Sequence, residues 1–149
     1  MNKNKLLLLF LFFSICGFAQ QNKSTIKNYL STYQISETDG TIGKTIFKIV
    51  IDDKNLNDKI EGFVKLIDQQ QKSTLINLKT KYFKTVKDKD GITYWFHLYG
   101  NEKFNVLRVC NWSEIQNIEG KNYKSIVIFS LYEDDNRISD LGMLCNKIN

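Results

Sequence analysis

Ile92–Cys110 reads ITYWFHLYGNEKFNVLRVC, and this stretch decides the fold. Both of its arms show the period-2 alternation of side chains that strands need. The loop between them, Gly100–Lys103, contains Gly and Asn, which tight connections prefer. The stretch therefore predicts a β-hairpin.

Closing this hairpin with Tyr99 opposite Phe104 places Trp95 opposite Arg108. Directly paired residues share a face. One face then becomes almost purely apolar, with Ile92, Tyr94, Phe96, Leu98, Leu107 and Val109. The other face collects Thr93, Trp95, His97, Tyr99, Phe104, Val106, Arg108 and Cys110. A slip by one residue would mix Arg108 into the apolar set, so we expect this register.

Four other stretches read as strands, because they alternate or are rich in β-branched and aromatic residues. They are Thr45–Ile51, Ile60–Ile67, Leu75–Lys84 and Tyr123–Tyr132. A helix from Asn57 to Gln71 competes with the second of them, although Gly62 weakens it. The third has Ile76, Leu78, Thr80 and Tyr82 on one face and Asn77, Lys79 and Lys81 on the other, as in a strand with one wet side.

Two stretches favour other structures. Ser24–Tyr33 has apolar residues at the spacing of an amphipathic helix, although its last residues could equally begin a strand. Asn111–Ile118 predicts a short helix or a covering loop. The expected fold is mainly β, a single-domain antiparallel meander of about six strands with a short N-terminal helix. It closes as a small barrel or folds over as a sandwich, and an α+β fold is the alternative.

Residues 1–19 predict an export signal. Lys3 and Lys5 precede the apolar run Leu6–Phe13, and Gly17 and Ala19 give the small residues that signal peptidase reads. The alternative is a lipoprotein acylated on Cys16, with Ile15 standing where a small residue is usual. The run is shorter than the roughly 20 residues of a membrane span. We expect residues 20–149 to form one exported domain, periplasmic or secreted, without a membrane span.

Cleavage before Gln20 leaves two cysteines, Cys110 and Cys145, in an oxidising compartment. They predict a disulfide that ties the C-terminal tail to the hairpin. In the chain-entropy model a loop of this length stabilises a fold by roughly 4 kcal/mol. The competing interpretation is a redox or nucleophilic cysteine, but neither residue lies in a C-x-x-C pair or beside a histidine.

The charge of the chain is mildly basic, with 21 Lys and Arg against 16 Asp and Glu. Lysines and acids alternate, as in Lys87–Asp90, which is typical of a solubilising surface rather than of a nucleic-acid groove. We therefore expect no nucleic-acid partner. The partner is a small ligand or a protein.

The candidate ligand-binding residues are Trp95, His97, Tyr99 and Arg108. Together they combine aromatic area with hydrogen-bond donors, a surface suited to a sugar ring, a small amphipathic ligand or a protein. Alternatively, Trp95 and Phe104 pack under the N-terminal helix or under Asn111–Ile118, and Arg108 reaches out to water.

Catalysis finds little support in the sequence. The chain has one histidine, which excludes multi-histidine metal sites, and it lacks the usual hydrolase and nucleotide motifs. Asp88-Lys89-Asp90-Gly91 matches part of a calcium loop but lacks its bidentate glutamate. We expect no catalytic residue, no metal and no cofactor. The leading hypothesis is a non-catalytic binding module, with the ligand in a barrel mouth or on the aromatic face. A protein-interaction module, such as an inhibitor or immunity-type protein, comes second and a small hydrolase third.

Overall fold

The computed structural model describes residues 26–36, 42–44, 46–52 and 62–148. They form antiparallel strands and no helix. The strands are β1 (Ile26–Ile35), β2 (Ile42–Gly43), β3 (Phe47–Asp52), β4 (Gly62–Asp68), β5 (Ser73–Lys87), β6 (Gly91–Tyr99), β7 (Val106–Ile118), β8 (Lys121–Glu133) and β9 (Asn136–Lys147). The predicted mainly β meander is confirmed, with more strands than expected.

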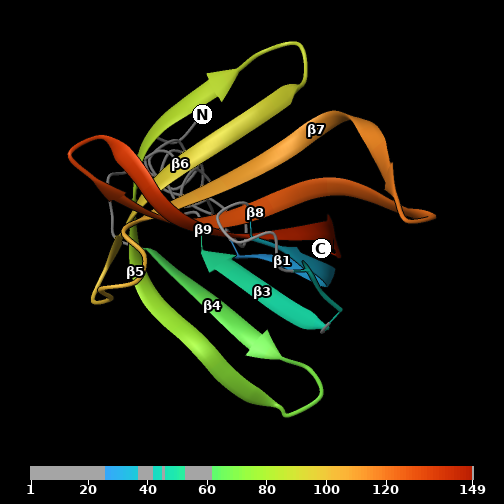
Figure 1. Ribbon diagram of the computed structural model, residues 1–149, viewed down its shortest axis with the longest axis horizontal. Helices are drawn as coiled ribbons and strands as arrows, with labels where there is room; N and C mark the ends of the chain where they lie inside the picture. The colour runs from blue at the N-terminus through green and yellow to red at the C-terminus, as the bar shows by residue number, and fades with distance from the viewer. Residues whose placement is uncertain (1–25, 37–41, 45, 53–61, 149) are drawn as a thin grey trace, which may run out of the picture.

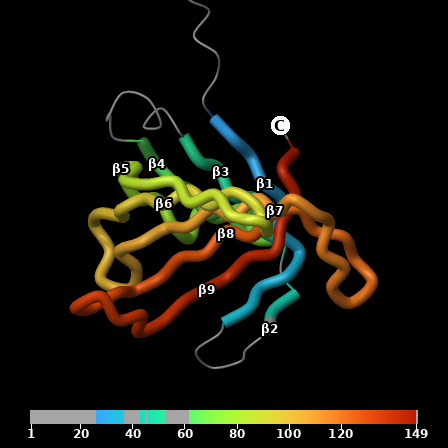
Figure 2. Tube along the Cα trace, turned by 90° about the horizontal axis from the view of Figure 1, so that it is seen from above, coloured from blue at the N-terminus to red at the C-terminus, as the bar shows by residue number. Residues whose placement is uncertain are grey.

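The sheet closes on itself because β1 pairs with both β3 and β9 (Figure 1). From β3 to β9 each strand pairs with the next one along the chain. The short β2 lies beside the end of β1 (Figure 2). Closure of this kind satisfies the backbone of the first and last strands, which would otherwise be open edges. The architecture is therefore a barrel built from a meander.

The β6–β7 hairpin has the predicted register. Trp95 pairs with Arg108, and His97 pairs with Val106. In the connecting loop, the Asn101 side-chain oxygen accepts hydrogen bonds from the backbone N–H groups of Lys103 (2.6 Å) and Phe104 (3.1 Å). The hairpin's apolar face enters the core, where Phe96, Leu98, Leu107 and Val109 are buried. Phe104 differs from the prediction, because it packs against the core with its ring 5.7 Å from that of Phe129.

The barrel interior is filled by one apolar cluster. Its fully buried members include Tyr29, Ile49, Val64, Phe96, Leu107, Val127, Phe129 and Met143. They come from seven strands of the closed sheet. Burial of this apolar area is the main stabilising contribution to the fold.

The predicted helix over Ser24–Tyr33 is wrong for the residues that the structure describes, since Ile26–Ile35 is strand β1. A register shift at Thr32 explains the helix-like spacing. Before the shift, Tyr29 points into the barrel, whereas after it Tyr33 packs in a second cluster outside. Ser31 stabilises the shift by donating its hydroxyl to the Tyr33 carbonyl at 3.1 Å. Apolar residues thus serve both faces of one strand, which mimics the period of a helix.

Asn111–Ile118 is neither a helix nor a covering loop, because it continues β7. The β7–β8 register shifts between Asn111 and Gln116, and beyond the shift the two strands form a projecting arm (Figure 1). The C-terminal tail is also a strand, β9, whose pairing with β1 closes the barrel. The competing helix over Asn57–Gln71 is likewise wrong where the structure describes it, since Gly62–Asp68 is β4.

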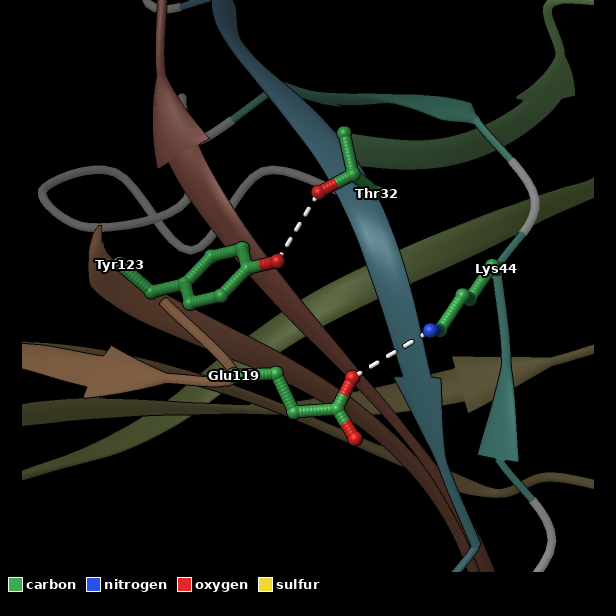
Figure 3. A network of polar contacts seen from close by, with 4 residues as sticks. All are labelled: Thr32, Lys44, Glu119 and Tyr123. Atoms are coloured by element: carbon green, nitrogen blue, oxygen red, sulfur yellow. Dashed lines mark hydrogen bonds and ion pairs between the residues drawn. The ribbon is translucent and has the colours of Figure 1, made fainter. Parts of the chain in front are cut away.

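The arm packs back on β1 through the second cluster. Tyr33, Tyr123 and Leu144 are buried there, with Ile35, Trp112, Ile118 and Ile126 against them. At its tip, the Glu119 carboxylate lies 3.4 Å from the Lys44 ammonium, and the hydroxyls of Tyr123 and Thr32 share a 3.0 Å hydrogen bond (Figure 3). A hydrogen bond from the Tyr33 hydroxyl lowers the pKa of Glu119 and raises that of Tyr33.

The predicted disulfide between Cys110 and Cys145 is wrong, because both cysteines are free. Cys145 lies in the core cluster inside the barrel. Cys110 pairs with Thr93 and Ile126 on the outer face. Side chains on opposite faces of a sheet cannot reach one another. Burial raises the pKa of the Cys145 thiol to about 12 and also raises that of Cys110.

The predicted signal, residues 1–19, and the alternative lipid site at Cys16 lie outside the described residues. Within the described part of the chain, no helix is long and apolar enough to cross a membrane.

Candidate functional site: an aromatic groove on the outer face

A groove of about 830 Å³ lies on the outer surface across β5, β6, the start of β7 and the β8–β9 turn. Its aromatic lining consists of Phe83, Trp95, His97, Tyr99 and Tyr132. Its polar lining consists of Lys84, Asn105, Asp134 and Asp135. The groove therefore combines ring faces with charged and hydrogen-bonding groups, as ligand sites commonly do.

The rings of the groove contact one another in a row. Phe83 stacks on His97 with 4.1 Å between ring centres, and it meets Trp95 edge-on at 6.1 Å. Tyr99 continues the row at 6.5 Å from His97. Phe83 is 38% exposed and Tyr99 45% exposed, so the row is open to solvent.

A β-bulge places Phe83 in this row. The β5–β6 register shifts between Tyr82, which pairs with Phe96, and Lys84, which pairs with Trp95. Tyr82 packs on the core, whereas Phe83 and Lys84 both contact rings on the outer face. A bulge inserts one extra residue and re-aims the side chains around it. Phe83 belongs to the groove only because the alternation of β5 breaks there.

Two cations flank Trp95. The Lys84 ammonium lies 4.3 Å from the Trp95 ring centre, and the Arg108 guanidinium carbon lies 5.2 Å from it. Both distances fit cation–π attraction. Arg108 also donates from Nη2 to the Ser130 hydroxyl at 3.3 Å. The buried Nε of Arg108 and the buried Nε1 of Trp95 have no acceptor among the described residues.

The opposite wall is the β8–β9 turn. Its two central residues, Asp134 and Asp135, have φ values of 48° and 65°, as a two-residue hairpin turn with left-handed positions requires. The Asn105 side chain ties the neighbouring loop to this hairpin. It donates to the Tyr132 carbonyl at 2.6 Å and accepts from the Tyr132 N–H at 2.9 Å. These paired bonds fix the distance between the two walls.

The structure brings together the residues that the sequence singled out. Trp95, His97 and Tyr99 line the groove, and Arg108 lies beside Trp95 at its margin. The predicted cover for this face is absent among the described residues, because the segments expected to supply it are strands β1 and β7. That Trp95, His97, Tyr99 and Arg108 bind a ligand stays a prediction.

Sequence reasoning missed Phe83, Lys84, Asn105 and the Asp134–Asp135 turn. The sequence has no local signal for the first two, since adjacent rings such as Tyr82 and Phe83 also occur at Trp95 and Phe96, where the strand keeps its alternation. Asn105, Asp134 and Asp135 reach the groove from the β8–β9 turn and from the loop bonded to it. Their distance from β6 depends on the curvature of the sheet, which local sequence does not encode.

The acidic turns do not form a metal site in the described part of the chain, where no group of three or more His, Cys, Asp or Glu side chains is placed to hold an ion. Asp88 instead accepts hydrogen bonds from the N–H groups of Asp90 (2.9 Å) and Gly91 (3.0 Å). This is the usual turn-stabilising role of aspartate.

Comparison of the chain with protein-family models, with curated proteins and with solved structures gives no match. The chemistry of the groove is therefore the basis for assigning a function.

Proposed function

We propose that the protein is an exported, non-catalytic binding module whose outer-face groove holds a small amphipathic ligand with a ring, such as a sugar. The observation that carries this proposal is the open row of Phe83, His97 and Tyr99, contributed by two strands. Large exposed aromatic area is unfavourable in water and is typical of a binding surface.

The groove suits a saccharide in two respects. The apolar C–H face of a sugar ring packs on an aromatic ring, and Tyr99 offers such a ring at the surface. Sugar hydroxyls need partners for both donors and acceptors. Asp134 and Asp135 accept hydrogen bonds, and Lys84 donates them. The site on the outer face is favoured over a barrel mouth because the core cluster fills the described interior.

The test is a binding titration of neutral and acidic oligosaccharides against wild type and Tyr99→Ala. Removal of the Tyr99 ring should weaken binding about threefold to tenfold, the usual contribution of one aromatic contact. Leu75→Ala is the matched control, because Leu75 is 52% exposed on the same sheet but outside the groove lining. Equal losses in the two variants, or no binding to any oligosaccharide, would contradict the proposal.

Protein interaction through the β7–β8 arm is the second candidate. Ile115 on this arm is 61% exposed. Among the described residues, no strand pairs with β7 on its β6 side beyond Trp112. An exposed edge with an apolar side chain suits an added strand from a partner. A complex that Ile115→Asp disrupts and Tyr99→Ala spares would favour this candidate.

A further inference from the structure

We infer that the ligand of the groove is an acidic saccharide, whose carboxylate or sulfate groups bind to Arg108 and Lys84 on either side of Trp95. This inference rests on the proposed function, because it names the chemical class of the ligand of the same groove. It follows from the two cations beside Trp95, which have no carboxylate partner among the residues that the structure describes.

Arg108 is half-buried, and its hydrogen-bonding groups are poorly used. A guanidinium has five N–H donors, yet the one hydrogen bond of the Arg108 side chain in the described residues is the 3.3 Å contact to Ser130. Neither Arg108 nor Lys84 forms an ion pair with a carboxylate of the described part of the chain. A partly buried cation without a counter-ion is unfavourable, and a bound anion would remove that penalty.

The strand pairing places the two cations on either side of Trp95, on the same face of the sheet. Lys84 on β5 pairs with Trp95, and Trp95 pairs with Arg108 on β7. Both side chains contact the same indole ring, each from the strand on one side of it, so an acidic saccharide lying over Trp95 can place an anionic group at each cation. The planar fork of arginine binds carboxylate and sulfate oxygens in pairs. Lys81, an exposed residue that pairs with His97, adds a third cation to this face of the sheet.

The same arrangement disfavours a nucleic acid. The Trp95 ring already carries Lys84 and Arg108, which leaves little of its face for a base. Asp134 and Asp135 on the opposite wall accept hydrogen bonds from hydroxyl groups, of which a sugar ring carries several and the backbone within a DNA chain has none. Anionic groups at one end and hydroxyls at the other are the features of an acidic saccharide.

The experiment compares matched probes on the full chain by calorimetry at low and high salt. Oligogalacturonate is compared with its methyl ester, which has the same skeleton without charge. A chondroitin sulfate oligosaccharide is compared with its desulfated form, and a single-stranded DNA oligonucleotide is included. In the pair whose anionic group is recognised, the charged saccharide should bind at least about tenfold more tightly than its ester or desulfated form. This difference in affinity should be smaller at high salt.

The variants Arg108→Gln and Lys84→Gln should each lose about tenfold in affinity for the anionic form and little for the uncharged ester. Lys87→Gln is the control, because Lys87 is exposed on the same strand and outside the groove lining. If Arg108→Gln fails to fold, the exposed Lys84 carries the test alone. The pair that shows the difference identifies carboxylate or sulfate as the recognised group.

Two results would overturn the inference and leave the proposed function standing. One is equal binding within both matched pairs, the acid and its ester and the sulfated and desulfated saccharides, with a loss in Tyr99→Ala. The other is equal behaviour of Lys84→Gln and Lys87→Gln toward the acidic probe. Tighter binding of the DNA oligonucleotide would overturn it in favour of a nucleic-acid partner. If no saccharide of either kind binds, the proposed function falls together with the inference.

Discussion

Gly91→Ala should destabilise the fold by about 3 kcal/mol or more, because β6 and β7 approach each other too closely there for a side chain. A Cβ atom at Gly91 would lie 2.1 Å from the carbonyl oxygen of Asn111, a backbone atom that cannot turn away. Gly91 also has a φ of 151°, which residues with a side chain rarely adopt. Gly91 pairs with Trp112 at the end of the hairpin that carries Trp95 and Arg108.

Urea unfolding followed by far-UV circular dichroism measures the loss as a lower midpoint. Gly120→Ala is the matched control, since Gly120 has a φ of 75° with nothing within 4 Å of its added Cβ. That variant should lose only the left-handed penalty, about 1 to 2 kcal/mol. If both variants lose the same stability, close approach of the strands does not determine the cost at Gly91.

Two further predictions concern the arm and the cysteines. The hydrogen bond from Tyr33 lowers the pKa of Glu119, so its stabilising effect should be complete above about pH 4.3 and disappear as the pH falls through the lowered value. The urea midpoint of Glu119→Gln should therefore fall less on acidification than that of wild type, whereas Glu114→Gln, on the same arm, should behave as wild type. Thiol labelling with peptide mapping should find both Cys110 and Cys145 modified after unfolding without reductant. In the native protein, buried Cys145 should be protected from the label. If neither cysteine is labelled after unfolding, the two form a disulfide after all.

The β6–β7 hairpin could be predicted in register because its information is local. The Gly100–Lys103 loop fixes the pairing, and a slip would bury Arg108. The correct faces follow from that pairing, and three of the four predicted site residues line one groove. Only Phe104 departs, since it follows the loop and turns inward.

The errors occur where a strand does not keep its alternation. A register shift at Thr32 turns the strand β1 into a pattern with helical spacing. A longer shift after Asn111 gives β7 a stretch that reads as a loop. In each case the sheet pairing, which joins residues far apart in the chain, overrides the local pattern. The cysteine prediction failed for a related reason, because an even count says nothing about which face each residue occupies.

The two apolar clusters outside the barrel differ in a way that supports the binding proposal. Each lies next to a register shift, one at Thr32 and one at Phe83. The protein covers the first with its own arm, so that Tyr33 is buried. The aromatic row of the groove stays open, although exposing rings such as Tyr99 lowers solubility and contributes little to folding. Since the arm covers the cluster around Tyr33 and no described segment covers the row of Phe83, His97 and Tyr99, the difference supports the proposal that this row binds an external ligand.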